Sequence, residues 1–473
     1  MAEARVVPSR LVVAFAVSEI VCVVGFFVLL WRGHDTIAVA CLLGPLQLLA
    51  FAFLMKQELW LLTFLAALIP FTALEILPHA YVHLVLLPLT FGLLLVVRLT
   101  QTWLTDHCLA PRKLAFRERA PLVLLGTLAV VSHVAAVLRG RPVSGWFQFV
   151  LTFYFLLAVW FFATTPRSLR QVRLLVYAMI PGYIAVCLLL PVFASRVEGG
   201  LLGKTLITSF SVVNLNSLAA HVGVLAAVVL GTALDAGRTG RRLAFVVATF
   251  LLLAALLFTK SRGAWLGFGV AFLYVLMRTR SLPLLLLAAV GAIGMYSMDF
   301  LRMSFVVRLQ ATGAADPSLW GRFLLWKYAW VVFKDNWLVG VGMQNYRLVK
   351  FLYGFPWPRS FGLPYNSHNL FLEFLTDLGI PGFVSLVWLK AVTFLQLDRT
   401  ARRPVEGRGL AIGLNAGLIV YAVHGLLDCV IWQHGAFVLL GMLLGLAIAV
   451  HRVVPSTGRA GSARIPGAVS ATD

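Results

Sequence analysis

Long apolar runs separated by short polar or basic connections make up most of the chain. About fourteen of these runs approach the roughly 20 residues that a membrane-spanning helix needs. Two of them, 243–259 and 264–277, are short, so twelve spans remain the alternative. The pattern predicts an all-α polytopic membrane protein with about 12–14 transmembrane helices. The expected spans are 11–31, 36–55, 59–77, 82–103, 120–138, 146–163, 172–192, 211–233, 243–259, 264–277, 282–298, 380–397, 410–428 and 434–451.

Residues 299–379 interrupt this pattern with a polar, aromatic and basic stretch. Asp316-Pro317 predicts a helix start, with aspartate as N-cap and proline at the first helical position, and the helix runs to about Lys334. Arg322, Trp326 and Trp330 share one face of it. This face suits either the membrane interface or packing against neighbouring helices.

A second helix is expected at the end of the same stretch. Ser367 is its predicted cap, His368 lies in its first turn, and Gly379 ends it before Pro381. Between the two helices, Gly340-Val341-Gly342 is a weak phosphate-loop signal and is more typical of a plain turn.

Composition and charge agree with a membrane protein. Hydrophobic residues make up 61% of the chain and charged residues 12%, against about 25% charged residues in soluble domains. The five cysteines show no spacing typical of a metal site or a disulfide framework. The first apolar run has full spanning length, so we expect no cleaved signal peptide.

Clusters of Lys and Arg orient the spans. With fourteen spans and a cytoplasmic N-terminus, five basic loops all fall on the cytoplasmic side. The expected organisation is helices 1–11 in 1–298, an outer loop with two or more helices in 299–379, C-terminal helices in 380–452, and a basic cytoplasmic tail in 453–473 that we expect to be disordered. The net charge of +21 is only partly explained by this rule, because the outer stretch is also basic. Its basic residues are either a solvated face or an anion site for phosphates at the membrane surface.

Two sequence elements contain residues suited to phosphate binding or acid–base catalysis. Lys260-Ser261-Arg262-Gly263 forms a tight hairpin between apolar runs, where cations are costly unless paired, although Lys260 can also snorkel to the interface. Arginine is suited to bidentate phosphate binding. His368 at a helix N-terminus is expected to favour the neutral imidazole that a general base needs, or to serve only as a capping residue. Weaker candidates are polar residues that either line a cavity or bond across helices: Asn214, Asn216 and His221.

These residues resemble a known family. His368-Asn369, followed after nine residues by Gly379-Ile380-Pro381-Gly382, is similar to the His-Asn-x9-Gly-x-x-Gly pattern of the O-antigen ligases. Lys260 to Ala264 resembles that family's Ser-Arg-Gly/Ala element, and Trp320-Gly321-Arg322 resembles its arginine element. The resemblance covers about residues 200–445, in family order. It implies a glycosyltransferase of the bacterial (Gram-negative) inner membrane, with its active site on the periplasmic side. The donor pocket would then lie in 1–298, including the 260–264 hairpin, and 299–379 would be the periplasmic catalytic loop.

The resemblance implies transfer of O-antigen from undecaprenyl diphosphate to a sugar hydroxyl of lipid A–core oligosaccharide. His368 would be the base, and Arg262 and Arg322 would stabilise the diphosphate. Further substrate-binding candidates are Asn369, Lys260, Lys327 and Arg196. Aromatic residues could stack on sugars or, as is commoner, lie at the lipid interface: Trp320, Trp326, Trp357 and Tyr365. We expect no metal and no cofactor, inversion at the anomeric carbon, and no nucleic-acid partner.

Three other functions remain open. An O-antigen polymerase would use the same donor with a second lipid-linked chain as acceptor, and an O-linked oligosaccharyltransferase would use protein Ser or Thr. A lipid or polysaccharide transporter would carry ionisable residues at mid-membrane or internal repeats. The sequence shows few such charges, with Glu19 and Glu75 the nearest cases, and no obvious repeat.

Overall fold

The computed structural model describes residues 58–70, 75–76, 82–104, 113–143, 146–199, 204–208, 211–286, 317–356, 366–430 and 434–454. The expected spans 11–31 and 36–55, and most of 282–298, lie outside these residues. The described helices are α4 (Glu58–Leu68), α5 (Val82–Leu104), α6 (Phe116–Leu138), α7 (Trp146–Thr164), α8 (Leu169–Phe193), α9 (Leu215–Leu234), α10 (Thr239–Thr259), α11 (Arg262–Thr279), α14 (Pro317–Asp335), α15 (Tyr346–Leu352), α16 (Leu370–Ala401), α17 (Arg408–Gly425) and α18 (His434–Val453).

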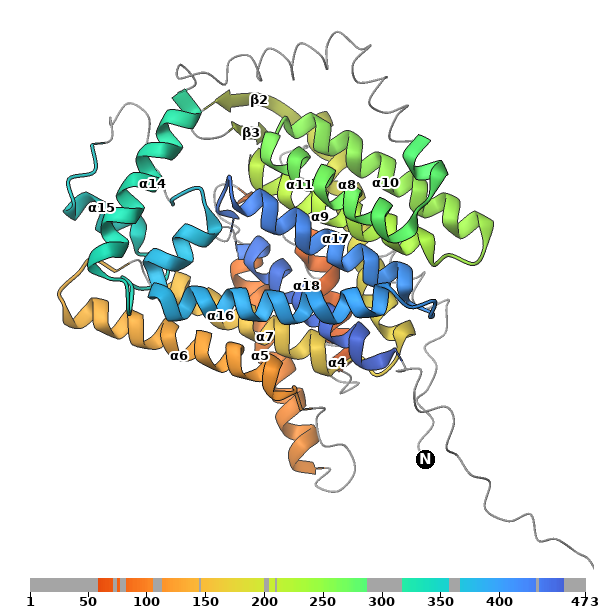
Figure 1. Cartoon of the computed structure of the whole chain (residues 1–473), viewed down its shortest axis with the longest axis horizontal. Helices are drawn as coiled ribbons and strands as arrows, with labels where there is room; N and C mark the ends of the chain where they lie inside the picture. Colours follow the sequence, from red (N-terminus) through yellow and green to blue (C-terminus); the bar gives the residue numbers. More distant parts are fainter. Residues whose placement is uncertain are drawn as a thin grey trace, which may run out of the picture.

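The helical membrane fold is confirmed. Within the described residues, helices α6, α8, α9, α10, α16 and α18 contain segments long and apolar enough to cross a membrane. They run alongside shorter apolar helices, and α6 and α16 lie side by side along the long axis of the molecule (Figure 1). The chain is therefore a multi-pass membrane protein.

The structure also contains a small antiparallel sheet, which the apolar pattern does not predict. Its strands are β1 (Glu75–Ile76), β2 (Ala194–Gly199), β3 (Lys204–Thr208) and β4 (Ser211–Asn214), in the order β1-β4-β3-β2. The predicted spans 59–77 and 211–233 are therefore wrong at their outer ends. At Asn214 the reason is local, because its side chain accepts hydrogen bonds from the amides of Asn216 and Ser217 and so starts α9 there.

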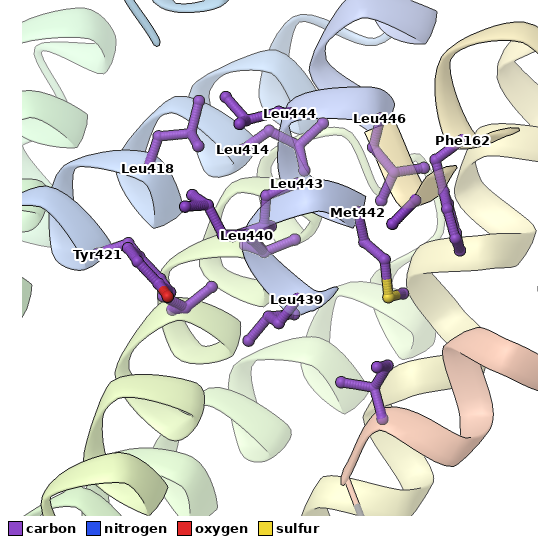
Figure 2. Close-up of a cluster of buried hydrophobic side chains, with 14 of the residues drawn as sticks. Phe162, Leu414, Leu418, Tyr421, Leu439, Leu440, Met442, Leu443, Leu444 and Leu446 are labelled. Carbon is purple, nitrogen blue, oxygen red and sulfur yellow. The ribbon is translucent and has the colours of Figure 1, made fainter. Parts of the chain in front are cut away.

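The membrane core is built by close helix contacts. A methyl group added to Gly231 of α9 would lie 2.2 Å from Cα of Gly413 in α17, so the two backbones touch. On the other side of α17, Leu414, Leu418 and Tyr421 pack against the leucines of α18, which in turn meets Phe162 of α7 (Figure 2). This packing fixes the end of α17, where the candidate site lies.

Helix α16 is broken at Gly379, as the glycine pattern predicts. Gly379 has φ +68°, and a side chain there would lie 2.6 Å from the backbone of Leu338. The neighbouring loop docks on this break, because the amides of Val341 and Gly342 donate to the carbonyls of Thr376 and Asp377. Gly340-Val341-Gly342 is thus a structural turn whose inner amides already have protein acceptors.

Helices α14 and α15 are the described part of the long polar stretch, and they gather at one end of the molecule (Figure 1). Helix α14 begins at Pro317 as predicted. Leu325, Ala329 and Val332 form its buried face against α15, whereas Phe323 and Trp330 are 61% and 48% exposed. The two interpretations of this helix therefore apply to different faces, since one side packs and the other remains open.

Candidate active site

The connection after α17 collects hydrogen bonds from segments far apart in the sequence. The side-chain amide of Asn369 donates to the Leu426 carbonyl at 3.1 Å, and that of Asn366 donates to the Cys429 carbonyl at 3.1 Å. Nε of Arg322 donates to the Leu427 carbonyl, also at 3.1 Å. The connection Leu426–Cys429 is therefore the point where α14, the start of α16 and the end of α17 meet.

His368 faces this connection and pairs with a carboxylate. Its Nδ1 lies 2.7 Å from Oδ1 of Asp428, which is 6% exposed. An ionised carboxylate only accepts hydrogen bonds, so Nδ1 carries the proton and Nε2 keeps its lone pair. The imidazole is thus held in the tautomer that can accept a proton.

The backbone holds His368 in a restricted conformation. Its φ of +50° lies in the left-handed region, which typically costs a non-glycine residue about 1–3 kcal/mol. The prediction that Ser367 caps α16 and that His368 lies in its first turn is wrong. Asn369 is the N-cap, accepting from the amides of Phe371 and Leu372, because only its side chain reaches those amides. His368 therefore lies just outside the helix and meets a carboxylate rather than the helix amides.

The surroundings of Asp428 keep its carboxyl ionised. Burial alone would raise the pKa of Asp428, but the charge and hydrogen bond of His368, together with the nearby His424 and Arg322, lower the pKa well below its ordinary value. Asp428 therefore stays a carboxylate throughout the neutral range and remains available to orient His368.

The hairpin of Arg262 reaches the same connection from another direction. Lys260 caps α10 in a left-handed conformation, φ +53°, and Arg262 opens α11. A side chain at Gly263 would lie 3.3 Å from the ring of His424 and 3.4 Å from Cβ of Leu427. The glycine beside Arg262 thus lets the hairpin approach the end of α17. The structure brings this hairpin, Arg322 and His368 together.

Two buried charged residues, Glu373 and Lys350, lie near the loop that contains His368. Glu373 is fully buried, and its Oε2 accepts the amide of Ser367 at 2.7 Å. Lys350 of α15 is also fully buried, beneath the rings of Tyr346 and Phe355. Burial lowers the pKa of Lys350 to about 7, although the charge of Glu373 opposes this shift and that of Arg347 adds to it. Glu373 therefore connects two parts of the site. Its charge acts on Lys350 of α15, and its carboxylate accepts from Ser367, the residue before the candidate base His368.

Three other predicted substrate contacts lie differently. The Asn369 side chain donates through Nδ2 to the Leu426 carbonyl and accepts through Oδ1 from the Phe371 amide, so it has a structural role. Its contact with substrate stays a prediction. Lys327 is exposed and, five positions after Arg322, points about 140° away from it around α14. Arg196 lies in β2, paired with Ile207 of β3, and its role also stays a prediction.

The remaining candidates bond within the protein or lie outside the described residues. His221 meets the hydroxyl of Tyr183 across α8 and α9 at 3.2 Å, as the helix-to-helix alternative predicts. Trp357 and Tyr365 lie outside the described residues. Among those residues, no group of three or more His, Cys, Asp or Glu side chains is arranged to hold a metal. The expectation of a metal-free reaction stays a prediction.

Sequence reasoning missed Asp428 and His424. Both lie at the end of a predicted span, and an ionisable residue at such a position is a signal that could have been followed. The spacing of 60 residues between His368 and Asp428 hides their contact.

Comparison with family models gives one match within the chain. The model described as O-antigen ligase matches residues 247–387. This region is similar to the O-antigen ligase family. A search of the curated proteins finds no match.

The region that matches the O-antigen ligase model runs from α10 into α16. It contains Arg262, Arg322 and His368, whereas Asp428 lies beyond it. The match supports a glycosyltransferase-like enzyme of the O-antigen ligase and polymerase superfamily, a family that implies polysaccharide or lipid-linked substrates.

Proposed function

We propose that this protein transfers O-antigen polysaccharide from undecaprenyl diphosphate to a sugar hydroxyl of lipid A–core oligosaccharide, at the periplasmic face of a Gram-negative inner membrane. The observation that carries the proposal is the approach of three elements to Leu426–Cys429: the Arg262 hairpin, Arg322 and the His368–Asp428 pair. These supply a proton acceptor and fixed positive charge, which transfer from a diphosphate needs.

The reaction follows from these positions. Nε2 of His368 takes the proton of the acceptor hydroxyl as its oxygen bonds to the anomeric carbon of the donor sugar. The bond between that carbon and the phosphate oxygen breaks, and undecaprenyl diphosphate leaves with the electron pair. One attack on the face opposite the leaving group inverts the anomeric centre.

Each assigned residue has a separate role. Asp428 holds the tautomer and stabilises the imidazolium that forms, as a buried carboxylate does beside a catalytic histidine. Arg262 and Arg322 stabilise the negative charge that develops on the diphosphate. Since arginines can supply this charge without a metal, the proposed reaction is metal-independent.

Reconstitution tests the proposal. Purified protein in lipid vesicles is given lipid-linked O-antigen with lipid A–core oligosaccharide, a second lipid-linked chain or a Ser/Thr peptide as acceptor. Transfer to lipid A–core, unchanged by chelator, is the expected result. Transfer only to the lipid-linked chain would identify a polymerase, and transfer only to peptide an oligosaccharyltransferase. Movement of the donor across the bilayer without transfer would identify a transporter.

A further inference from the structure

Lys390 is a basic residue of α16, within the predicted span 380–397. Among the described residues, its Nζ is buried and has no hydrogen-bond partner. Two aromatic rings flank it instead, with ring centres 5.0 Å away at Phe371 and 5.6 Å away at Tyr421. An ionisable group at such a place in a membrane protein usually marks a functional site.

The two rings place Lys390 beside the candidate active site. Phe371 is three residues after His368, in the first turn of α16, and Tyr421 is about one turn of α17 before His424, so each ring is close in the chain to a histidine of the site. The break at Gly379 makes this possible, because it turns the first part of α16 away from the direction of the second. The ammonium group therefore approaches the site from the side of the spanning helices.

Lys390 lies next to the exposed, lipid-facing surface of α16. Leu386 and Leu389 on one side of it are fully buried, whereas Val387 on the other side is 39% exposed. Val384 and Trp388 continue the exposed face. Lys390 thus lies at the border between the packed face and the lipid-facing surface of the helix. A lipid-linked ligand moving within the membrane can reach this border sideways.

We propose that Lys390 is a third cation for the diphosphate of the polyprenyl-linked donor, held between Phe371 and Tyr421 until that lipid binds. This inference deepens the proposed function and rests on it for the identity of the ligand. An ammonium group offers three donors and no acceptor, so its natural partner is an anion. The rings hold it by cation–π attraction without using its hydrogen-bonding capacity. A phosphate oxygen would supply the missing acceptor.

The first measurement is stability. Lys390→Met keeps a long apolar stem between the two rings and removes a buried charge. We expect its thermal midpoint in detergent to equal or exceed that of the wild type, because no hydrogen bond within the described residues is lost. A purely structural lysine would instead give a clear loss of stability, and that result would overturn the proposal.

The second measurement is binding, with undecaprenyl diphosphate, undecaprenol and phosphatidylglycerol as separate ligands. Lys390→Met should bind undecaprenyl diphosphate about tenfold more weakly or worse, since a charge-assisted contact is lost. Its binding of undecaprenol should not change. Lys390→Arg should retain most of the affinity, and the exposed-lysine control Lys334→Met should match the wild type.

Three outcomes would overturn the proposal: unchanged binding of undecaprenyl diphosphate by Lys390→Met, an equal loss for undecaprenol, or wild-type binding no tighter than that of phosphatidylglycerol. Binding and transfer are read separately. If no acceptor is glycosylated but the Lys390 effect on diphosphate binding persists, the proposed transfer fails and the Lys390 site stands. If transfer occurs and Lys390→Met binds normally, only the Lys390 site fails.

Discussion

Each end of α16 lies beside an acidic residue with basic partners, but the two arrangements are built differently: Asp398 belongs to α16 itself, whereas Asp428 belongs to the connection after α17. Near the C-terminal end, Asp398 meets Nη2 of Arg278 at 2.5 Å and Nε of Arg402 at 2.8 Å, and it accepts from Tyr274. Near the N-terminal end, Asp428 meets the imidazole of His368. The first carboxylate joins permanently charged arginines, and the second joins an imidazole whose other ring nitrogen can accept a proton.

The difference separates a structural ion network from a reactive pair. Two arginines and a hydroxyl occupy the Asp398 oxygens, so that end stabilises the junction of α11 and α16. At the other end, the carboxylate fixes the tautomer of His368 and leaves Nε2 to act on a ligand. Charge alone does not distinguish the two ends, but the kind of partner does.

The largest expected effect is at His368. His368→Ala should lower transfer by about 10³-fold or more, because the proton acceptor is lost. Transfer is measured with purified enzyme, donor and acceptor. The thermal midpoint should stay near that of the wild type, and full activity in this variant would remove the base assignment.

Asp428→Asn should lower transfer by about 10²–10³-fold, since an amide can donate to Nδ1 and move the imidazole proton to Nε2. Asp398→Asn is the matched change at the other end of α16. If both variants lose activity equally, the distinction between the two ends is wrong. Nitrogen NMR of labelled histidine reports the tautomer directly.

Arg322→Lys should reduce kcat by about 10–10²-fold, because a planar fork becomes a point charge. Lys334→Arg, an exchange between the same residue types at an exposed position of α14, is the control and should leave kcat unchanged. Wild-type kcat in Arg322→Lys would argue against a phosphate contact.

Asp398→Asn should destabilise the protein by about 1–3 kcal/mol while leaving transfer intact, because two arginines lose a buried partner. Denaturant unfolding followed by the loss of helical signal measures this change. A loss of kcat at unchanged stability would show that the Asp398 end takes part in the reaction.

A further expected effect concerns pH and stability. Lys350 has a pKa of about 7 in the folded protein against 10.5 ordinarily, so between these values the unfolded chain binds more protons. Stability should therefore rise as pH increases from about 7 to 10.5, and the penalty should be full below pH 7. Thermal midpoints across this range should show the rise in the wild type and in Lys334→Met, but not in Lys350→Met. If Lys350→Met shows the same rise in thermal midpoint, another titrating group causes the rise.

Sequence alone determined the membrane class, most helix positions and three parts of the candidate site. Apolar runs have no alternative to spanning helices, and the motifs around Arg262, Arg322 and His368 are local in the chain. Proline at 317 and glycine at 379 act on their own backbone, so the start of α14 and the break in α16 could be predicted from neighbouring residues alone.

Only the tertiary structure decided the partners of these residues. Asp428, 60 positions from His368, and the rings around Lys390 are brought close by helix packing, which no local pattern encodes. The same holds for the basic residues of the outer stretch. Burial separates Lys350, beneath its rings, from Arg322 at the site and from exposed Lys327 and Lys334. Their shared charge made them look like one group, and packing gave them different environments.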